Sequence, residues 1–194
     1  MKGIGAIMFA SLLVAATASG QMRRREAAVP ADAVSPEAAV AALYASVSFP
    51  AGGAPDFERM RGVFLYVGMV VPPVKTGQEI AVSDVDSWSE KFQKAAAERK
   101  QKGEPGQGFF EREIARRTDC FGNVCQIFST YEGRRLATDE KPFVRGINSI
   151  QLVRDGKRWW IASVVWDTER PDNPIPPDYD KQKAGVPAEY LKKN

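Results

Sequence analysis

The stretch TDCFGNVCQIF, residues 118–128, decides the fold, because a short turn separates two segments of alternating side chains. Gly122 and Asn123 are residue types that a two-residue hairpin turn prefers, since both tolerate a positive φ. A turn at these positions places Cys120 opposite Cys125. On the same face it pairs Thr118 with Ile127, Arg116 with Ser129, and Ile114 with Tyr131. The sequence therefore predicts an antiparallel hairpin with a defined inner face.

A second hairpin is predicted in RGINSIQLVRDGKRWWIASVVWD, residues 145–167, with its turn at Asp155-Gly156. On one face this turn pairs Leu152 with Trp159, Ile150 with Ile161, Asn148 with Ser163, and Gly146 with Val165, and it places Asp167 next. The opposite face then carries Arg145, Trp160 and Trp166. Since both faces are partly apolar, we expect helices on one side of the sheet and a partner or the chain's own tail on the other.

The first half of the domain reads as helices. Ser35-Pro36-Glu37 has the N-cap, N1 proline and acidic first turn of a helix start. Asp56 is placed to cap a short second helix, and Ser83-Asp84 to begin a third that ends before Gly103. An apolar strand is predicted at residues 65–71, and the proline-rich segment 171–177 is expected to cross the surface as a strap.

This order predicts an α+β protein with a cone-shaped, cystatin-like fold, in which three N-terminal helices pack on a curved antiparallel sheet. Over residues 35–180, the Gly-Asn and Asp-Gly turns, the RGINSIQL run and the tryptophan-rich last strand resemble uncharacterised exported bacterial members of the nuclear transport factor 2-like, SnoaL-like superfamily. The superfamily includes isomerases, dehydratases, hydrolases, cyclases and non-catalytic modules. The resemblance therefore implies a fold and not a reaction.

Composition excludes several chemistries. The 194 residues contain no histidine, so Ser-His-Asp and Cys-His catalysis and His-ligated metals are absent. No metal-ligand cluster, phosphate loop or dinucleotide fingerprint occurs, and no cofactor is predicted. The net charge of +3 comes from 27 basic and 24 acidic residues scattered along the chain, which argues against nucleic-acid binding.

Residues 1–20 read as a signal peptide, because Lys2 precedes an apolar run that ends in small residues. Residues 21–34 are expected to be a linker, residues 35–180 the domain, and residues 181–194 a C-terminal tail. The predicted location is the periplasm or the cell exterior. Three arginines at positions 23–25 directly follow the apolar run and leave an uncleaved membrane anchor as the alternative.

Cys120 and Cys125 are the chain's two cysteines. In an exported protein, two cysteines that face each other in a hairpin are expected to form a disulfide. The alternative is a pair of small buried thiols beneath a helix.

The inner faces of the two hairpins predict a pocket with an apolar floor and a polar mouth. Asp167 is the candidate general base, and Tyr131 the candidate hydrogen-bond donor to a carbonyl. The candidate binding residues are Arg116, Ser129, Asn148, Ser163, Trp159 and Ile161. The alternative interpretation pairs Asp167 with Arg116 structurally and uses Tyr131 and Asn148 to satisfy buried backbone groups.

Glu113 and Glu132 fall opposite each other on the outer face, where they are interpreted as exposed residues flanked by Arg112 and Arg134, and a paired-carboxylate site is the alternative. Arg145, Trp160 and Trp166 form a candidate interface on that face, and pairing of family members through the open sheet implies a homodimer there. The alternative is that the proline-rich tail covers these rings within one chain.

Taken together, the sequence predicts a domain that binds a small apolar or carbonyl-containing molecule. The enzyme hypothesis is an isomerase, lyase or cyclase that moves a proton next to a carbonyl. A non-catalytic periplasmic interaction or dimerisation module is the alternative.

Overall fold

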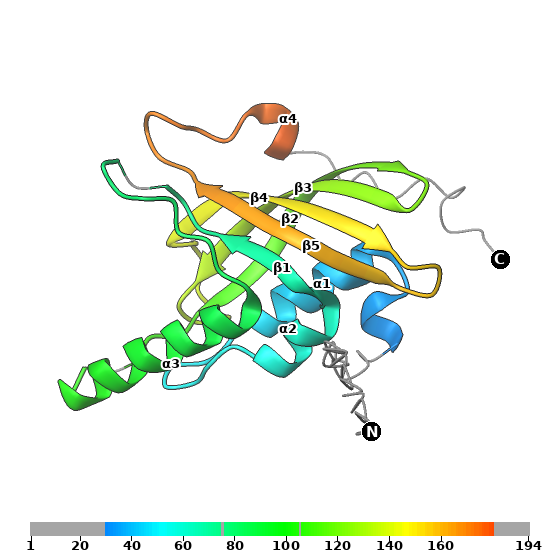
Figure 1. Ribbon diagram of the computed structural model, residues 1–194. Coiled ribbons are helices and arrows are strands. Elements are labelled where there is room, and N and C mark those ends of the chain that lie inside the picture. The colour runs from blue at the N-terminus through cyan, green and yellow to red at the C-terminus, as the bar shows by residue number, and fades with distance from the viewer. Residues whose placement is uncertain (1–29, 75, 105, 181–194) are drawn as a thin grey trace, which may run out of the picture.

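The computed structural model describes residues 30–74, 76–104 and 106–180, so the predicted signal peptide and the tail at 181–194 lie outside the described residues. It has the α+β architecture predicted from the sequence (Figure 1). The helices are η1 (Pro30–Ala33), α1 (Pro36–Val47), α2 (Phe57–Val63), α3 (Val85–Gln101) and α4 (Pro177–Asp180). The strands are β1 (Phe64–Val71), β2 (Phe110–Phe121), β3 (Val124–Arg134), β4 (Val144–Arg154) and β5 (Trp159–Thr168).

The predicted helix starts are confirmed by their caps. The side chain of Ser35 accepts a hydrogen bond from the backbone N–H of Ala38 at 3.1 Å. Asp56 and Asp84 cap α2 and α3 in the same way. These bonds satisfy N–H groups that the first turn of a helix leaves without a partner. The folded part begins earlier than expected, because η1 lies in the predicted linker and buries Ala33.

The five strands form one sheet in the order β1-β5-β4-β3-β2. Four of them are antiparallel neighbours, but β1 runs parallel to β5, so the sheet is mixed where the sequence predicted an antiparallel one. In Figure 1, α1, α2 and α3 lie on one side of the sheet and α4 lies on the other. The helices α1, α2 and α3 therefore cover the inner face, and α4, the last described element, lies on the outer face.

The first hairpin has the predicted turn and register near its tip, where Cys120 pairs with Cys125. A bulge at Ile114 then shifts the register, so Glu113 pairs with Tyr131 and Ile114 does not. Because one extra residue exchanges the two faces of a strand, Glu111 and Glu113 turn to the inner face. The prediction that Glu113 is exposed opposite Glu132 is wrong.

The second hairpin differs from prediction at two points. Its loop spans residues 155–158, and Arg154 pairs with Trp159, which moves the register by two positions and leaves the faces unchanged. The Asp155 carboxylate accepts hydrogen bonds from the backbone N–H groups of Lys157 and Arg158, which stabilises this longer loop.

Further along β5, the register shifts again next to Ala162. Leu152 pairs with Ile161, but the next residue of β4, Gln151, pairs with Ser163. This bulge exchanges the faces of the rest of β5. As a result, Trp166 turns to the inner face opposite Asn148, and Asp167 turns to the outer face.

The core lies at the closed end of the inner face. The side chains of Ile127, Ile150 and Ile161 have no solvent exposure there, and Leu152 has 1%. These strand residues pack in one cluster with apolar residues of α1 and α2. Trp159 and Ile161, predicted to contact a ligand, belong to this filled end.

Candidate functional site

A cavity of about 1360 Å³ occupies the other end of the inner face, between the sheet, α1, α3 and residues of the loops at 49–55, 103–104 and 106–107. Its wall is mostly apolar. The buried part includes Leu43, Phe64, Val70 and Val164, and the more exposed part lies near the end of α3. This space is larger than that of an ordinary small-ligand pocket, which is roughly 300–1,000 Å³.

Glu111 is the acid that the bulge in β2 brings into this wall. The side-chain amide of Asn148 donates a hydrogen bond to its Oε1 at 3.2 Å. Burial raises the pKa of Glu111 from 4.5 to about 7, and the Asn148 bond opposes this shift only in part. Near neutral pH the carboxyl group is therefore divided between its charged and neutral forms and is able both to accept and to return a proton.

A chain of hydrogen bonds continues from Asn148 through Tyr44, which also lines the cavity, to Ser129 and Glu113, which do not. The Asn148 amide also donates to the hydroxyl of Tyr44 at 3.0 Å, and the Tyr44 and Ser129 oxygens are 2.7 Å apart. The Ser129 hydroxyl donates to Glu113. A hydroxyl group has one proton to donate, and that of Ser129 is directed to Glu113. The Tyr44 hydroxyl therefore donates to Ser129, and the Asn148 amide donates to both Tyr44 and Glu111. This series of hydrogen bonds therefore orients the Asn148 amide so that its N–H points at the Glu111 carboxylate.

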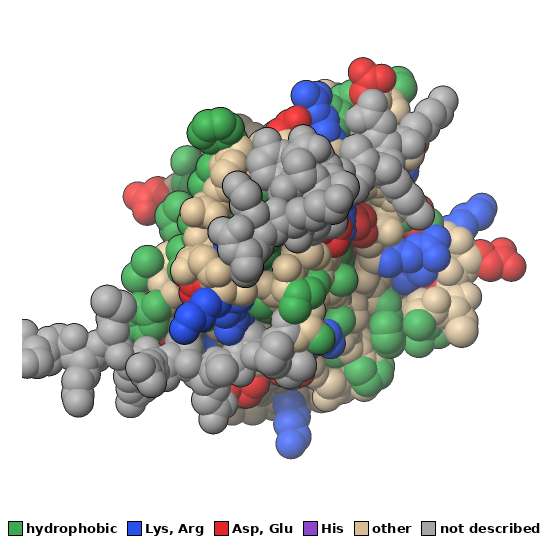
Figure 2. Space-filling model, turned by 90° about the vertical axis from the view of Figure 1, so that its right-hand side faces the viewer, with side chains coloured by type: hydrophobic (Ala, Val, Ile, Leu, Met, Phe, Trp, Pro, Cys, Tyr) green, Lys and Arg blue, Asp and Glu red, His purple; other side chains and the backbone are tan. Residues whose placement is uncertain are grey.

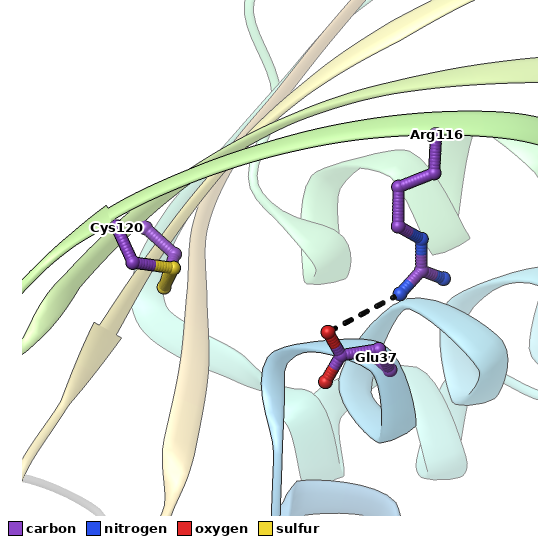
Figure 3. Close-up of a disulfide and its surroundings, with 4 residues drawn as sticks. Glu37, Arg116 and Cys120 are labelled. Atoms are coloured by element: carbon purple, nitrogen blue, oxygen red, sulfur yellow. Dashed lines mark ion pairs between the residues drawn. A yellow bond between two sulfur atoms is a disulfide. The ribbon is translucent and has the colours of Figure 1, made fainter. Parts of the chain in front are cut away.

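Arg116 anchors the far end of this chain (Figure 3). It forms ion pairs with Glu113 at 2.5 Å and with Glu37 of α1 at 3.8 Å. Neither Arg116 nor Ser129, both predicted to bind a ligand, lines the cavity. They instead hold other residues of the hydrogen-bond series in place. The predicted disulfide between Cys120 and Cys125 is present further along the same strand, with a Cα–Cα distance of 4.2 Å.

Of the predicted catalytic and binding residues, Tyr131 and Asn148 line the cavity. Burial, followed by the negative charge of Glu111, raises the pKa of Tyr131 above its ordinary value, so its hydroxyl stays protonated. The ring lies against Gly146, where a Cβ atom would be 2.6 Å from the Tyr131 hydroxyl oxygen. A residue without a side chain at position 146 therefore makes room for Tyr131.

Asp167, the predicted base, does not belong to this site. It lies on the outer face, where its carboxylate pairs with Arg170 at 2.9 Å and accepts a hydrogen bond from Asn173. The hydrogen bond from Arg170 holds its pKa below the ordinary value. The alternative pairing of Asp167 with Arg116 is wrong as well. Ser163 is buried beside the β5 bulge and does not line the cavity.

The predicted outer-face interface is also divided. Trp166 lines the cavity. Trp160 instead donates a hydrogen bond from Nε1 to the Asp155 carboxylate. The guanidinium carbon of Arg158 lies 3.7 Å from the centroid of the Trp160 ring. Arg145 pairs with Glu169 and Asp180. The three residues therefore do not form one surface.

The end of the described chain covers another part of the outer face. The ring of Tyr179 in α4 lies 5.6 Å from that of Phe128, and Thr130 donates a hydrogen bond to the Tyr179 carbonyl at 2.6 Å. α4 thus lies over β2 and β3, and not over the tryptophans that the alternative interpretation had the tail cover.

Sequence reasoning missed Glu111 because it assumed an unbroken register in β2. One signal was present: that register placed Glu113 directly opposite Glu132, and like charges at such positions are destabilising. The bulge removes this conflict, and Glu132 instead pairs with Arg112 and Arg134.

Within residues 30–74, 76–104 and 106–180, no group of cysteine, aspartate and glutamate side chains is arranged to hold a metal ion. Over the same ranges, no helix is long and apolar enough to cross a membrane. In the face shown in Figure 2, basic side chains are separated by acidic and apolar ones where described atoms are visible.

No protein-family model and no curated protein matches the chain. One similar solved structure is an NTF2-like protein of unknown function from Shewanella baltica, with 12% identity, a TM-score of 0.40, and coverage of 59% of this chain and 79% of that one. Another is the Kfla4162 protein from Kribbella flavida, with 15% identity, a TM-score of 0.38, and coverage of 57% and 74%.

The architecture itself, with helices on the inner face of a curved five-stranded sheet, is the nuclear transport factor 2-like fold predicted from the sequence. No activity is carried over from either neighbour, since this fold supports many functions.

Proposed function

We propose that the protein binds a partly apolar, carbonyl-containing molecule in the cavity and that Glu111 moves a proton on it. The observation that carries the proposal is a carboxyl group with a pKa of about 7 in the wall of a large, mostly apolar cavity. A base of this kind is poised to act at neutral pH, and the apolar surroundings strengthen its interaction with developing charge.

The chemistry that these residues support is a proton shift next to a carbonyl. The Glu111 carboxylate removes a proton from the carbon beside the carbonyl. The electron pair of that C–H bond forms a double bond to the carbonyl carbon, and the π electron pair of the carbonyl moves to its oxygen. Tyr131 donates a hydrogen bond to the resulting enolate. Protonated Glu111 then returns the proton to another carbon of the conjugated system, so that no oxidant or reductant is needed.

Isomerisation of 3-cyclohexenone to its conjugated isomer, followed by ultraviolet absorbance, tests this proposal. We expect the rate to rise with pH to a plateau, with a midpoint near 7, because the carboxylate form is the base. Glu111→Gln should lower the rate about 100-fold or more. Asp167→Asn is the matched control, because it removes an outer-face carboxylate, and its rate should equal that of the wild type.

Unfolding curves must show that Glu111→Gln remains folded. Absence of turnover in the wild type, or equal rates for the wild type and a folded Glu111→Gln variant, would contradict proton transfer by Glu111.

Export and dimerisation through the outer face stay predictions. The interaction-module alternative relied on Trp160 and Trp166 together, and the structure places their rings on opposite faces of β5. The cavity therefore favours ligand binding over that alternative.

A further inference from the structure

The charged side chains of the cavity wall differ in burial. Glu111 lies at the polar inner part with Asn148, whereas Arg99, Lys100 and Arg135 line the exposed part. One acid, Glu104, lines the exposed part as well, so three cations face one acid there. The rest of the wall is formed mainly by apolar side chains.

Arg135 is held at the rim by packing. It directly follows β3, and its guanidinium carbon lies 3.6 Å from the centroid of the Phe143 ring. Phe143 packs in turn on Phe109, with 6.1 Å between the ring centroids. Gly108 lets the backbone at Arg135 pass close by, since a Cβ atom at position 108 would collide with the Arg135 carbonyl oxygen. The cation is therefore positioned by two aromatic rings that themselves line the cavity.

Arg99 and Lys100 belong to the last turn of α3, whose inner side forms one wall of the cavity. Among the described residues, no ion pair engages Arg99, Lys100 or Arg135. Most other arginines of the domain, including Arg59, Arg61 and Arg116, are paired with acids. The cations at the rim are thus available to an anion that arrives with a ligand.

We propose that the cavity takes an amphiphile with a long or multi-ring apolar body and an acidic end group, held with the acidic group against Arg99, Lys100 and Arg135. This inference rests on the proposed ligand-binding role of the cavity and adds the class of ligand. The volume suits a large apolar body, and the charge at the rim suits a carboxylate. The opposite orientation would place the acid against Glu111 and is disfavoured by charge repulsion.

Binding of dansyl-labelled undecanoic acid and of its methyl ester, measured by dansyl fluorescence at pH 8, tests the proposal. The two probes share an apolar body and differ in the charge. We expect the acid to bind about tenfold more tightly at low salt, which corresponds to about 1.4 kcal/mol. Because the three cations are exposed, this preference should weaken as salt is added.

A triple variant, Arg99→Gln, Lys100→Gln and Arg135→Gln, should reduce the affinity for the acid to that for the ester and leave the ester unchanged. Lys94→Gln is the matched control, because Lys94 is an exposed cation of α3 that does not line the cavity. It should preserve the preference for the acid.

The outcomes separate the two proposals. Equal binding of acid and ester by the wild type, or an unchanged preference in the triple variant, would overturn the acidic end group and leave the ligand cavity in place. Failure of both probes to bind would overturn the amphiphile together with the ligand-binding role.

Discussion

The two ends of the inner face are built from the same strands, yet one end is filled and the other is hollow. At the closed end, the side chains of Ile127, Ile150 and Leu152 are buried in one apolar cluster with residues of α1 and α2. At the open end, Tyr131, Asn148 and Trp166 border a cavity of about 1360 Å³. The closed end of the sheet therefore contributes mainly to stability, and the open end has room for a ligand.

Two bulges decide which side chains of β2 and β5 face the cavity. One is at Ile114 in β2 and the other is at Ala162 in β5, and beyond each bulge the faces of its strand are exchanged. One bulge turns Glu111 inward, where burial raises its pKa, and the other turns Asp167 outward, where Arg170 lowers its pKa. Two carboxylates near the same end of the sheet thus acquire opposite properties from backbone geometry alone.

The largest loss of stability should come from shortening a buried side chain at the closed end. Leu152→Ala should lower the free energy of unfolding by about 4 kcal/mol, because it leaves a void in a close-packed region. Leu43→Ala makes the same chemical change in the wall of the cavity and should cost about 2 kcal/mol, since only the transfer of the lost atoms is involved. Denaturant unfolding measures both, and equal losses would contradict the division into filled and hollow ends.

The pH dependence of stability should show whether Glu111 is buried as an acid with a raised pKa at the open end. Because the fold raises the pKa of Glu111, its stabilising contribution is complete below the pKa of the unfolded chain and is lost as pH rises through about 7. Between about pH 4 and pH 8, the wild type should lose about 3 kcal/mol relative to Glu111→Gln.

Unfolding curves of the two proteins across this range provide the measurement. Glu90→Gln, which removes an exposed acid on α3, should follow the wild type at every pH. A constant difference between the wild type and Glu111→Gln would mean that the acid is solvated in the folded protein.

A smaller effect is expected from the disulfide at the closed end. Replacing Cys120 and Cys125 by alanine should lower the free energy of unfolding by about 2 kcal/mol, because the closed loop is short. Binding and turnover at the open end should not change. Reduction of the wild type with dithiothreitol should reproduce the loss, and a reduced protein as stable as the oxidised one would show that the bond contributes nothing.

Local features of the fold could be predicted from the sequence. The caps at Ser35, Asp56 and Asp84 and the turn at Gly122-Asn123 each depend on a few neighbouring residues, and all are present. The disulfide followed from that turn. The parallel pairing of β1 with β5 joins segments far apart in the chain, and no local pattern encodes it.

The site itself was only partly predictable, because its composition depends on bulges. Tyr131 and Asn148 lie on strands whose inner face the predicted register identified, and both line the cavity. Glu111, Trp166 and Asp167 lie beyond a bulge on their own strand, and all three were placed on the wrong face or overlooked. A bulge is selected by packing and charge across the whole sheet, so the sequence of one strand does not reveal it.

The bulge at Ala162 also bears on how such a domain changes during evolution. Loss of a single residue at that point would rotate the end of β5, so that the indole of Trp166 leaves the wall and the carboxylate of Asp167 enters it. A gain or loss of one codon could thus convert an aromatic lining into an acidic one without any amino-acid replacement. In sheets of this kind, length variation is a route to new chemistry that substitution scans would not sample.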